Sequence, residues 1–372
     1  MPKVLSFAGL GVKQGKGSKL KLTKIVFGFG ILVVFMGLFA CSQNTERRVD
    51  RLFKAYRGED RPGAAVMVIQ DGSPILTKCY GMANLEENIP VTSSTNFRLA
   101  SVTKQFTAMS IMILSERGQL DINSTLQDIF TDFPTYGKDI TIRHILQHNS
   151  GLIDYESLIP DTAMVQVLDR DVLRMMMAQD STYFEPGTAY QYSNSGYAVL
   201  AMIVEQVSGK SFAQFLDENI FQPLGMNHTL AFEEGISTVS NRAIGYFVEK
   251  DSIGFSDQSL TSAVLGDGGI YSSIDDLLLW DQALYTDQLV SSETLRQIFT
   301  PGLENYGFGW RIEAYKGHPR VYHAGSTCGF RTCIHRLPED EFTVIILTNR
   351  RDPAVDDLAG KLIDMYLIRR KK

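Results

Sequence analysis

The hydrophobic positions at the two ends of the chain follow a strand-like pattern. Residues 64–69 and 75–80 are short apolar runs on either side of the turn Asp71-Gly72-Ser73-Pro74, which predicts a hairpin. Further apolar runs, bounded by Gly, Pro and charged residues, lie near the other end at 309–312, 320–323, 330–335 and 342–347. We expect the strands from both ends to meet in one antiparallel sheet.

Between these ends the apolar positions recur with helical spacing, in residues 106–114, 173–178, 197–207 and 277–284. Helices are also expected over residues 45–57 and after Asp352, which would cap the last helix with Pro353 in its first turn. The pattern predicts an α+β fold. In it, an antiparallel sheet flanked by N- and C-terminal helices carries an inserted all-helical lobe, with a cleft between the two lobes.

The first forty residues have the layout of an export signal. Residues 1–24 contain six lysines and no acid, and the apolar run 25–39 is shorter than the roughly 20 residues that a membrane-spanning helix needs. The segment Leu38-Phe39-Ala40-Cys41 resembles the bacterial lipoprotein signal, although Phe39 is bulky for its position. This implies cleavage before Cys41 and lipidation of its sulfur. We expect an exported protein, lipid-anchored to a bacterial membrane in the periplasm or at the cell surface, with an uncleaved signal anchor as the alternative.

These features divide the chain into three parts. Residues 1–40 form the signal peptide, 41–60 a tether with the first helix, and 61–370 one domain. Within that domain, the segments 61–100 and 305–370 are expected to build the α/β lobe, and 101–304 the helical lobe.

Charge and cysteine content exclude two classes of partner. The chain has 36 basic and 42 acidic residues, and without the six leader lysines 30 basic residues face 42 acidic ones, a net charge of −12. This charge repels phosphate backbones, so no nucleic-acid partner is expected. Cys328, Cys333 and His335 are only three candidate ligands among apolar neighbours, so we expect no metal site.

The first candidate catalytic motif is Ser101-Val102-Thr103-Lys104, at the start of a predicted helix that ends near Gly118. Residues three apart share a helix face, so the lysine amine can reach and activate the serine hydroxyl. Free N–H groups at the helix start can also stabilise an oxyanion. Taken alone, the motif favours a simple helix cap at Ser101.

Two further motifs follow along the chain. Tyr192-Ser193-Asn194 precedes a predicted helix; such a tyrosine can exchange protons and the asparagine amide can hold a substrate carbonyl, or Asn194 can simply cap the helix. His323-Ala324-Gly325-Ser326 is rich in small residues, which would let a substrate pair with the strand edge. A strand end entering a glycine turn is the alternative there.

In this order the three motifs resemble the serine β-lactamase and penicillin-binding family, which includes class C β-lactamases, D-alanyl-D-alanine carboxypeptidases, D-aminopeptidases and esterases. The resemblance covers residues 60–350 and includes Gly266-Asp267-Gly268-Gly269, a loop that lines the cleft in some relatives or serves only a tight turn. It implies a β-lactamase/transpeptidase-like fold.

The resemblance also implies roles for individual residues. Ser101 would be the acylated nucleophile, Lys104 and Tyr192 the proton-transfer pair, and Asn194 a substrate-orienting group. The main-chain N–H groups of Ser101 and Ser326 would form the oxyanion hole, next to Gly325 on the substrate-binding strand. Which of Lys104 and Tyr192 is the immediate base stays open.

One position departs from the family pattern, because His323 stands where β-lactamases carry a lysine. Histidine is mostly neutral at pH 7, which disfavours β-lactam hydrolysis and is similar to the pattern of D-amino-acid peptidases and esterases. We expect imidazolium at His323 to hold a substrate carboxylate, so that KM for D-Ala-terminated peptides rises above pH ~6.5. Arg331 is a second candidate cation, unless it is simply exposed on its strand.

The sequence thus predicts a serine hydrolase that needs no cofactor and forms an acyl-enzyme on Ser101. It would cleave amides or esters, with D-amino-acid peptides as expected substrates. The expected partners are a small peptide, ester or β-lactam, peptidoglycan, and a membrane through the lipid anchor. Two alternatives remain: a penicillin or peptidoglycan sensor without efficient turnover, and a true β-lactamase.

Overall fold

The computed structural model of the protein describes residues 45–250 and 252–368, so the expected signal peptide and Cys41 lie outside the described residues. Residues 45–52 are helical, and a separate 3₁₀ turn, η1 (Lys54–Tyr56), follows; the helix expected over 45–57 is therefore shorter than predicted. Within the described ranges, no helix combines the length and apolar character that crossing a bilayer requires.

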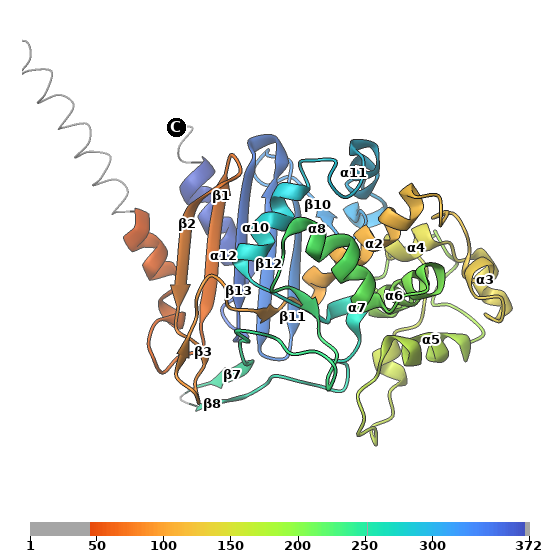
Figure 1. The fold of residues 1–372 in the computed structure, drawn as a ribbon, viewed down its shortest axis with the longest axis horizontal. Helices are drawn as coiled ribbons and strands as arrows, with labels where there is room; N and C mark the ends of the chain where they lie inside the picture. The colour runs from red at the N-terminus through yellow and green to blue at the C-terminus, as the bar shows by residue number, and fades with distance from the viewer. Residues whose placement is uncertain (1–44, 251, 369–372) are drawn as a thin grey trace, which may run out of the picture. The chain divides into compact units, whose positions relative to one another are not determined.

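The strands from the two ends of the chain meet in one six-stranded antiparallel sheet, which confirms the predicted pairing (Figure 1). Its order is β10-β11-β12-β13-β1-β2. The strands are β1 (Ala64–Gln70), β2 (Ser73–Tyr80), β10 (Arg311–Ile312), β11 (Val321–Thr327), β12 (Phe330–Leu337) and β13 (Phe342–Thr348). The pairing of β1 with β13 joins the two ends of the chain in one sheet, so the residues between β2 and β10 form an insertion.

Both faces of this sheet are buried. Successive side chains of a strand point to opposite faces, and each face packs against other elements. Met67 and its partner Ile345 belong to the main hydrophobic core, while their neighbours Val66 and Ile346 point to the other side. α12 (Val355–Ile363) covers that second side, and α10 (Ile274–Ala283) packs on the first, against β1 and β13 (Figure 1). Each fully buried aliphatic side chain contributes about 1.5–3 kcal/mol, so the sheet is a rigid support.

The last helix starts later than expected. α12 begins at Val355 with Ala354 as its N-cap, so Asp352 does not cap it and Pro353 precedes it. The helix begins where its buried stripe begins, at Val355, Leu358 and Leu362. Here the position of the apolar stripe decided the helix start, and the capping residues did not.

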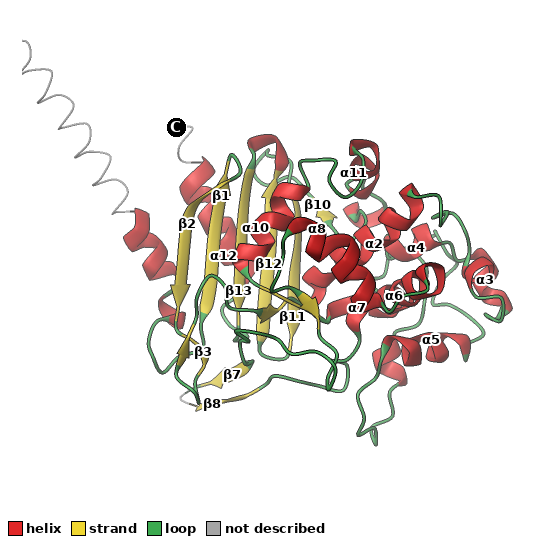
Figure 2. Cartoon of the chain, in the orientation of Figure 1, coloured by secondary structure: helices red, strands yellow, loops and turns green. Residues whose placement is uncertain are grey.

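The insertion between the two halves of the sheet is mainly helical (Figure 2). Its helices are α2 (Lys104–Glu116), α3 (Leu126–Ile129), α4 (Ile142–Leu146), α5 (Asp169–Met177), α6 (Asn194–Ser208), α7 (Phe212–Leu216), α8 (Gln222–Leu224), α9 (Leu265–Gly268), α10 and α11 (Ser292–Ile298). α6 packs against α2, α4, α5 and α9 and is buried along most of its length.

The expectation of an all-helical insertion needs one correction, because it also contains strands. Inside the insertion, β9 (Ile270–Ser272) pairs with β6 (Leu230–Ala231), and on its other side β9 pairs with β5 (Phe97–Arg98), which precedes the insertion. β7 (Tyr246–Glu249) and β8 (Ser252–Phe255) form a hairpin. Outside the insertion, β3 (Met82–Asn84) pairs with β4 (Ile89–Pro90). These strands are too short for an alternating pattern to reveal them. Helix α10 also belongs to the sheet lobe by its packing.

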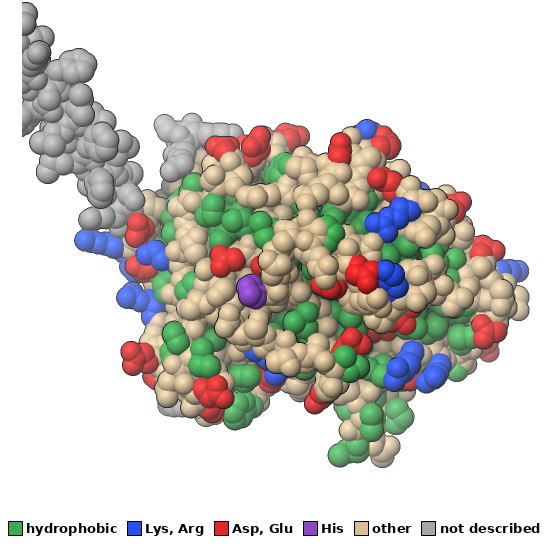
Figure 3. Space-filling model, in the orientation of Figure 1, with side chains coloured by type: hydrophobic (Ala, Val, Ile, Leu, Met, Phe, Trp, Pro, Cys, Tyr) green, Lys and Arg blue, Asp and Glu red, His purple; other side chains and the backbone are tan. Residues whose placement is uncertain are grey.

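Surface charges of both signs are interspersed on the face shown in Figure 3. The net negative charge of the chain is therefore not gathered into one patch on this face.

Candidate active site

Ser101 lies in a 3₁₀ turn, not at the start of an α-helix as expected. The turn η2 covers Ala100–Thr103, and α2 begins at Lys104. The strained left-handed backbone of Ala100, with φ +50°, joins β5 to this turn and keeps the α-helix from starting earlier. Residues three apart eclipse each other in a 3₁₀ turn, so Lys104 stands directly beside Ser101. No helix is capped by the Ser101 side chain, so the alternative of a simple cap is wrong.

Lys104 is fully buried, and its amino nitrogen lies within hydrogen-bond distance of three oxygen atoms. Nζ lies 3.3 Å from Ser101 Oγ, 2.9 Å from Asn194 Oδ1 and 2.8 Å from the main-chain oxygen of Asp267. It also lies 5.0 Å from the ring centre of Tyr192. The first two motifs therefore meet in space, as the sequence predicted.

The second motif lies at the start of helix α6, but the residue that caps this helix is not Asn194, as the alternative expected. Ser193 is the N-cap, accepting the Gly196 N–H through its side chain, and Asn194 is the first helical residue. This frees the Asn194 amide, which accepts from Lys104 and donates to Glu156 Oε1 at 3.1 Å. The hydroxyl of Tyr192 is buried and has no hydrogen-bond partner in the described part of the chain. Tyr192 therefore offers an unoccupied polar group beside the lysine.

The third motif lies inside strand β11, so the alternative of a glycine turn is wrong. A Cβ at Gly325 would lie 2.2 Å from the main-chain oxygen of Leu99, which also accepts a 2.6 Å bond from Thr332 Oγ1. The missing side chain of Gly325 makes room for the nucleophile turn rather than for substrate. Ser326, the next residue, is exposed and lines the same two pockets as Ser101.

His323 does not have the ordinary histidine pKa that the sequence interpretation assumed. It is 2% exposed, and burial, followed by the nearby Lys104 charge, lowers its pKa to about 3. Its Nδ1 lies 2.8 Å from the Ala324 carbonyl and therefore donates, so Nε2 accepts from the Tyr306 hydroxyl at 3.0 Å. The expectation that imidazolium at His323 holds a carboxylate near pH 6.5 is wrong, because the neutral form is favoured.

Arg331 does not supply the missing charge either. It is paired with Ser326 across β11 and β12, and its guanidinium donates to the main-chain oxygens of Phe330 and Cys328. Its neighbour Thr332 faces Leu99, so strand alternation turns Arg331 to the opposite side. Arg311 of β10 does line the groove beside Ser101, and its guanidinium lies 6.0 Å from the ring centre of Tyr192.

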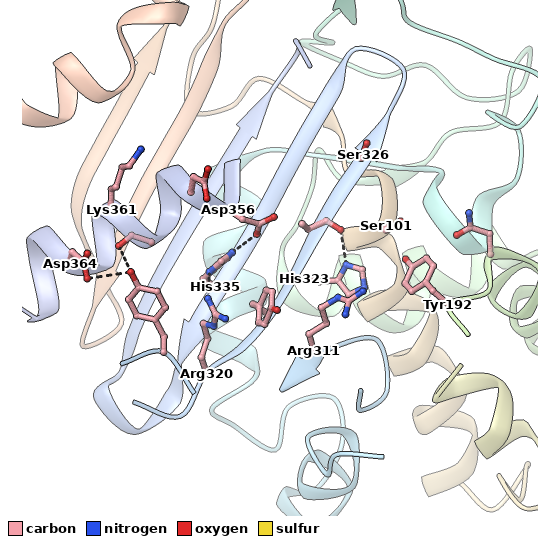
Figure 4. A pocket seen from close by; sticks show the side chains of 16 residues that line it. Ser101, Tyr192, Arg311, Arg320, His323, Ser326, His335, Asp356, Lys361 and Asp364 are labelled. Carbon is pink, nitrogen blue, oxygen red and sulfur yellow. Dashed lines mark hydrogen bonds and ion pairs between the residues drawn. The ribbon is translucent and has the colours of Figure 1, made fainter. Parts of the chain in front are cut away.

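Two pockets open on either side of Ser101, and Asn194 and Ser326 line both. The smaller, about 60 Å³, also contains Arg98, Glu156 and Gly268. The larger is a groove of about 810 Å³, with Ser101, Tyr192, His323 and Arg311 at one end and Lys361 and Asp364 at the other (Figure 4). A substrate can therefore cross the nucleophile and extend in both directions.

The Gly266–Gly269 segment lines the smaller pocket, as one of its two interpretations expected. It forms α9, whose Asp267 carbonyl accepts from Lys104. The carboxylate of Asp169 accepts the N–H groups of Leu265 and Gly266 at 2.8 and 2.9 Å and so fixes the start of α9. Burial raises the pKa of Asp169 to about 7 and that of Asp267 to about 6.

Cys333 and the groove-lining residues His335 and Asp356 have possible ligand atoms within 4.8 Å of one another. Cys328, which the sequence grouped with the first two, is not among them. Burial raises the pKa of the Cys333 thiol well above its usual range, and Arg320 lies 3.4 Å from His335 Nδ1. A neutral thiol and an adjacent guanidinium both disfavour a metal cation.

Glu156, Asp267 and Arg311 were not identified from the sequence. Glu156 and Arg311 belong to no recognisable motif, and all three residues reach the site through tertiary packing of η4 (Tyr155–Leu158), α9 or β10. For Asp267, the glycine-rich segment around it was the one available signal.

Comparison with known proteins gives this geometry its context. The sequence profile of the Beta-lactamase family matches residues 49–365. The chain belongs to the beta-lactamase family. As a member of this family, it has the β-lactamase/transpeptidase-like fold and is a serine hydrolase.

Within the beta-lactamase family, the chain is 32% identical over 332 residues to penicillin-binding protein 4* of Bacillus subtilis, covering 83% of this chain and 73% of that protein. It is 29% identical to a D-aminopeptidase of Gluconobacter oxydans, covering 79% of this chain but 57% of the relative. The octameric penicillin-binding protein homologue of Pyrococcus abyssi superposes with a TM-score of 0.75 and 25% identity, covering 88% of this chain and 77% of that one.

Proposed function

We propose that the protein hydrolyses short D-amino-acid peptides and amides that have a free amino group, through an acyl-enzyme on Ser101. The observation that carries this proposal is the carboxylate of Glu156 in the small pocket beside Ser101. Asn194 connects it to the catalytic lysine through bonds of 3.1 and 2.9 Å. An ammonium on the acyl residue would pair with Glu156. The preference for D-residues rests on the likeness to a D-aminopeptidase.

The larger groove would take the leaving group. Arg311 stands at its near end and can pair with a carboxylate, while the neutral His323 cannot. An unprotected D-dipeptide satisfies both ends, with its ammonium at Glu156 and its carboxylate at Arg311. Neutral His323 also argues against the alternative of an efficient β-lactamase, which carries a permanent cation at this position.

In the proposed reaction, Ser101 Oγ attacks the carbonyl carbon and its proton passes to the Lys104–Tyr192 pair. The main-chain N–H groups of Ser101 and Ser326 stabilise the oxyanion. The amide C–N bond then breaks, and the amine leaves with that proton. Water hydrolyses the ester on Ser101 by the same steps in reverse order.

A four-substrate comparison tests the proposal: D-Ala-D-Ala with its amino end free or acetylated, and its carboxyl end free or amidated. We expect acetylation to lower kcat/KM about tenfold, because a charge-assisted contact with Glu156 is lost. In Glu156→Gln this ratio should fall to near one, while Asp161→Asn, an exposed acid outside both pockets, keeps it.

Three results would contradict the proposal. Faster hydrolysis of acetylated substrates would indicate a carboxypeptidase, and efficient turnover of a chromogenic cephalosporin a β-lactamase. Stoichiometric labelling by penicillin without peptide turnover would indicate a penicillin-binding sensor, the function class favoured by the likeness to penicillin-binding protein 4*.

We also propose that the protein is exported and lipid-anchored through Cys41. The support is the sequence Leu38 to Cys41 after a basic and an apolar segment. The mature protein should begin at a lipid-modified Cys41 and partition into detergent, and Cys41→Ser should stop processing. An N-terminus mapped at Met1 by mass spectrometry would contradict this.

A further inference from the structure

His148 is a buried residue with an unusual backbone. It follows α4, is fully buried, and has a left-handed φ of +58°. Among the described residues, the buried non-glycine residues with positive φ are Ala100 and His148. Ala100 adjoins the nucleophile Ser101. Strained backbone of this kind concentrates at functional sites, which directs attention to what His148 contacts.

His148 holds the chain on both sides of Tyr192. Its main-chain oxygen accepts the Gln191 N–H at 2.9 Å, and its ring Nδ1 accepts the Ser193 N–H at 3.1 Å. Its ring lies 4.3 Å from the Tyr192 ring, centre to centre, and 4.4 Å from Tyr306. His148 therefore holds the backbone of the residues before and after Tyr192 and also packs against the Tyr192 ring.

This arrangement requires a neutral ring with its hydrogen on Nε2, because Nδ1 is an acceptor. Burial, followed by the charge of Lys104, lowers the pKa of His148 well below its usual value. The other titratable groups packed around it are four tyrosines, Tyr190, Tyr192, Tyr197 and Tyr306. His148 is therefore neutral at pH 7, and its Nδ1 remains an acceptor.

We propose that His148 is the positioning residue that fixes Tyr192 beside Lys104, through the acceptor Nδ1 and the left-handed backbone. The proposal rests on the proton-transfer role proposed for Tyr192. A displacement of the reacting group by about 1 Å lowers rates about 100-fold, so loss of this restraint should reduce kcat. Substrate binding at Glu156 and Arg311 should change little, because neither residue contacts His148 through a hydrogen bond.

Three substitutions at His148 separate the contribution of the Nδ1 acceptor from that of the left-handed backbone. His148→Asn keeps an acceptor near the Nδ1 position and tolerates a left-handed backbone; His148→Gly tolerates that backbone without an acceptor; His148→Leu has neither property. We expect His148→Asn to keep kcat within about threefold of wild type, and the other two to lose about 100-fold with KM within about threefold. The pH profile of kcat should stay as in wild type for His148→Asn and change in His148→Gly, where Tyr192 leaves its place beside the Lys104 charge. Rates are counted per active site titrated with a fluorophosphonate, which corrects for unfolded protein.

Tyr192→Phe, alone and combined with His148→Gly, completes the test. The double variant should be no slower than the slower single variant, because both changes remove the same function. An unchanged kcat in His148→Gly beside a reduced one in Tyr192→Phe refutes the positioning role alone. An unchanged kcat in Tyr192→Phe refutes the proton-transfer role and with it this proposal. Equal losses per site in all three His148 variants would show a packing role only.

Discussion

The interior of the site and the two mouths of the cleft hold their ionisable groups in different ways. Inside, Lys104 and His323 are almost inaccessible and each is fixed by hydrogen bonds to neighbouring groups. At the mouths, Glu156 is exposed and Arg311 half-buried. Interior charges act at low dielectric and set protonation states, whereas solvent screens the outer ones. The interior should therefore control the rate of the chemistry, and the mouths the choice of substrate.

The largest effect should come from the interior. Lys104→Met removes the amine bonded to Ser101 Oγ and should lower kcat/KM about 10³-fold for every substrate of the four-member comparison. The exposed lysine variant Lys138→Met is the matched control and should stay near wild type. A Lys104 loss confined to substrates with a free amine would break the distinction between interior and mouth.

A medium effect should appear in stability rather than rate. The folded pKa of His323, about 3, lies below its ordinary value of 6.5, so the unfolded chain binds the proton more tightly. Its stabilising contribution is complete above pH 6.5 and declines as pH falls toward 3, a loss of about 2 kcal/mol between pH 7 and 5. We expect urea denaturation to show that the free energy of unfolding of wild type exceeds that of His323→Gln by about 2 kcal/mol less at pH 5 than at pH 7.

The same residue should leave substrate affinity unaffected by pH. KM for D-Ala-terminated peptides should show no rise around pH 6.5, because His323 has no proton there to lose. A constant stability gap, or a KM that climbs through pH 6.5, would show that His323 titrates near its ordinary value.

The smallest effects separate two arginines on the sheet. Arg331→Gln should change kcat/KM less than about twofold, because Arg331 bonds to main-chain oxygens away from the cleft. Arg311→Gln should raise KM about tenfold for substrates with a free carboxylate and leave their amides unchanged. Reversed results would place the substrate carboxylate at Arg331 and contradict its proposed binding to Arg311 in the groove.

How far the sequence could predict this site depended on whether the signal was local. Ser101 and Lys104 are one turn apart, so their spacing alone indicated contact, and their order with Tyr192 and Asn194 indicated the family. His323 is neutral because it is buried and lies near the charge of Lys104, and no local pattern in the sequence reveals either condition.

The rest of the fold divides in the same way. The sheet that joins the two ends of the chain could be predicted from clear strand patterns. β5, β6 and β9 could not, because they have only two or three residues each. The helix cap at Ser193, one position before Asn194, depends on backbone angles that residue types only bias. Local chemistry was therefore predictable, and its electrostatic environment was not.

The central claim, that Ser101 is the nucleophile activated by Lys104, is tested most directly by intact mass spectrometry after reaction with a fluorophosphonate. We predict one adduct per chain, located on Ser101 by peptide mapping, and none in Ser101→Ala that retains the wild-type circular dichroism spectrum. An adduct of the same mass on folded Ser101→Ala, or one mapped to another residue of the wild type, would contradict the mechanism.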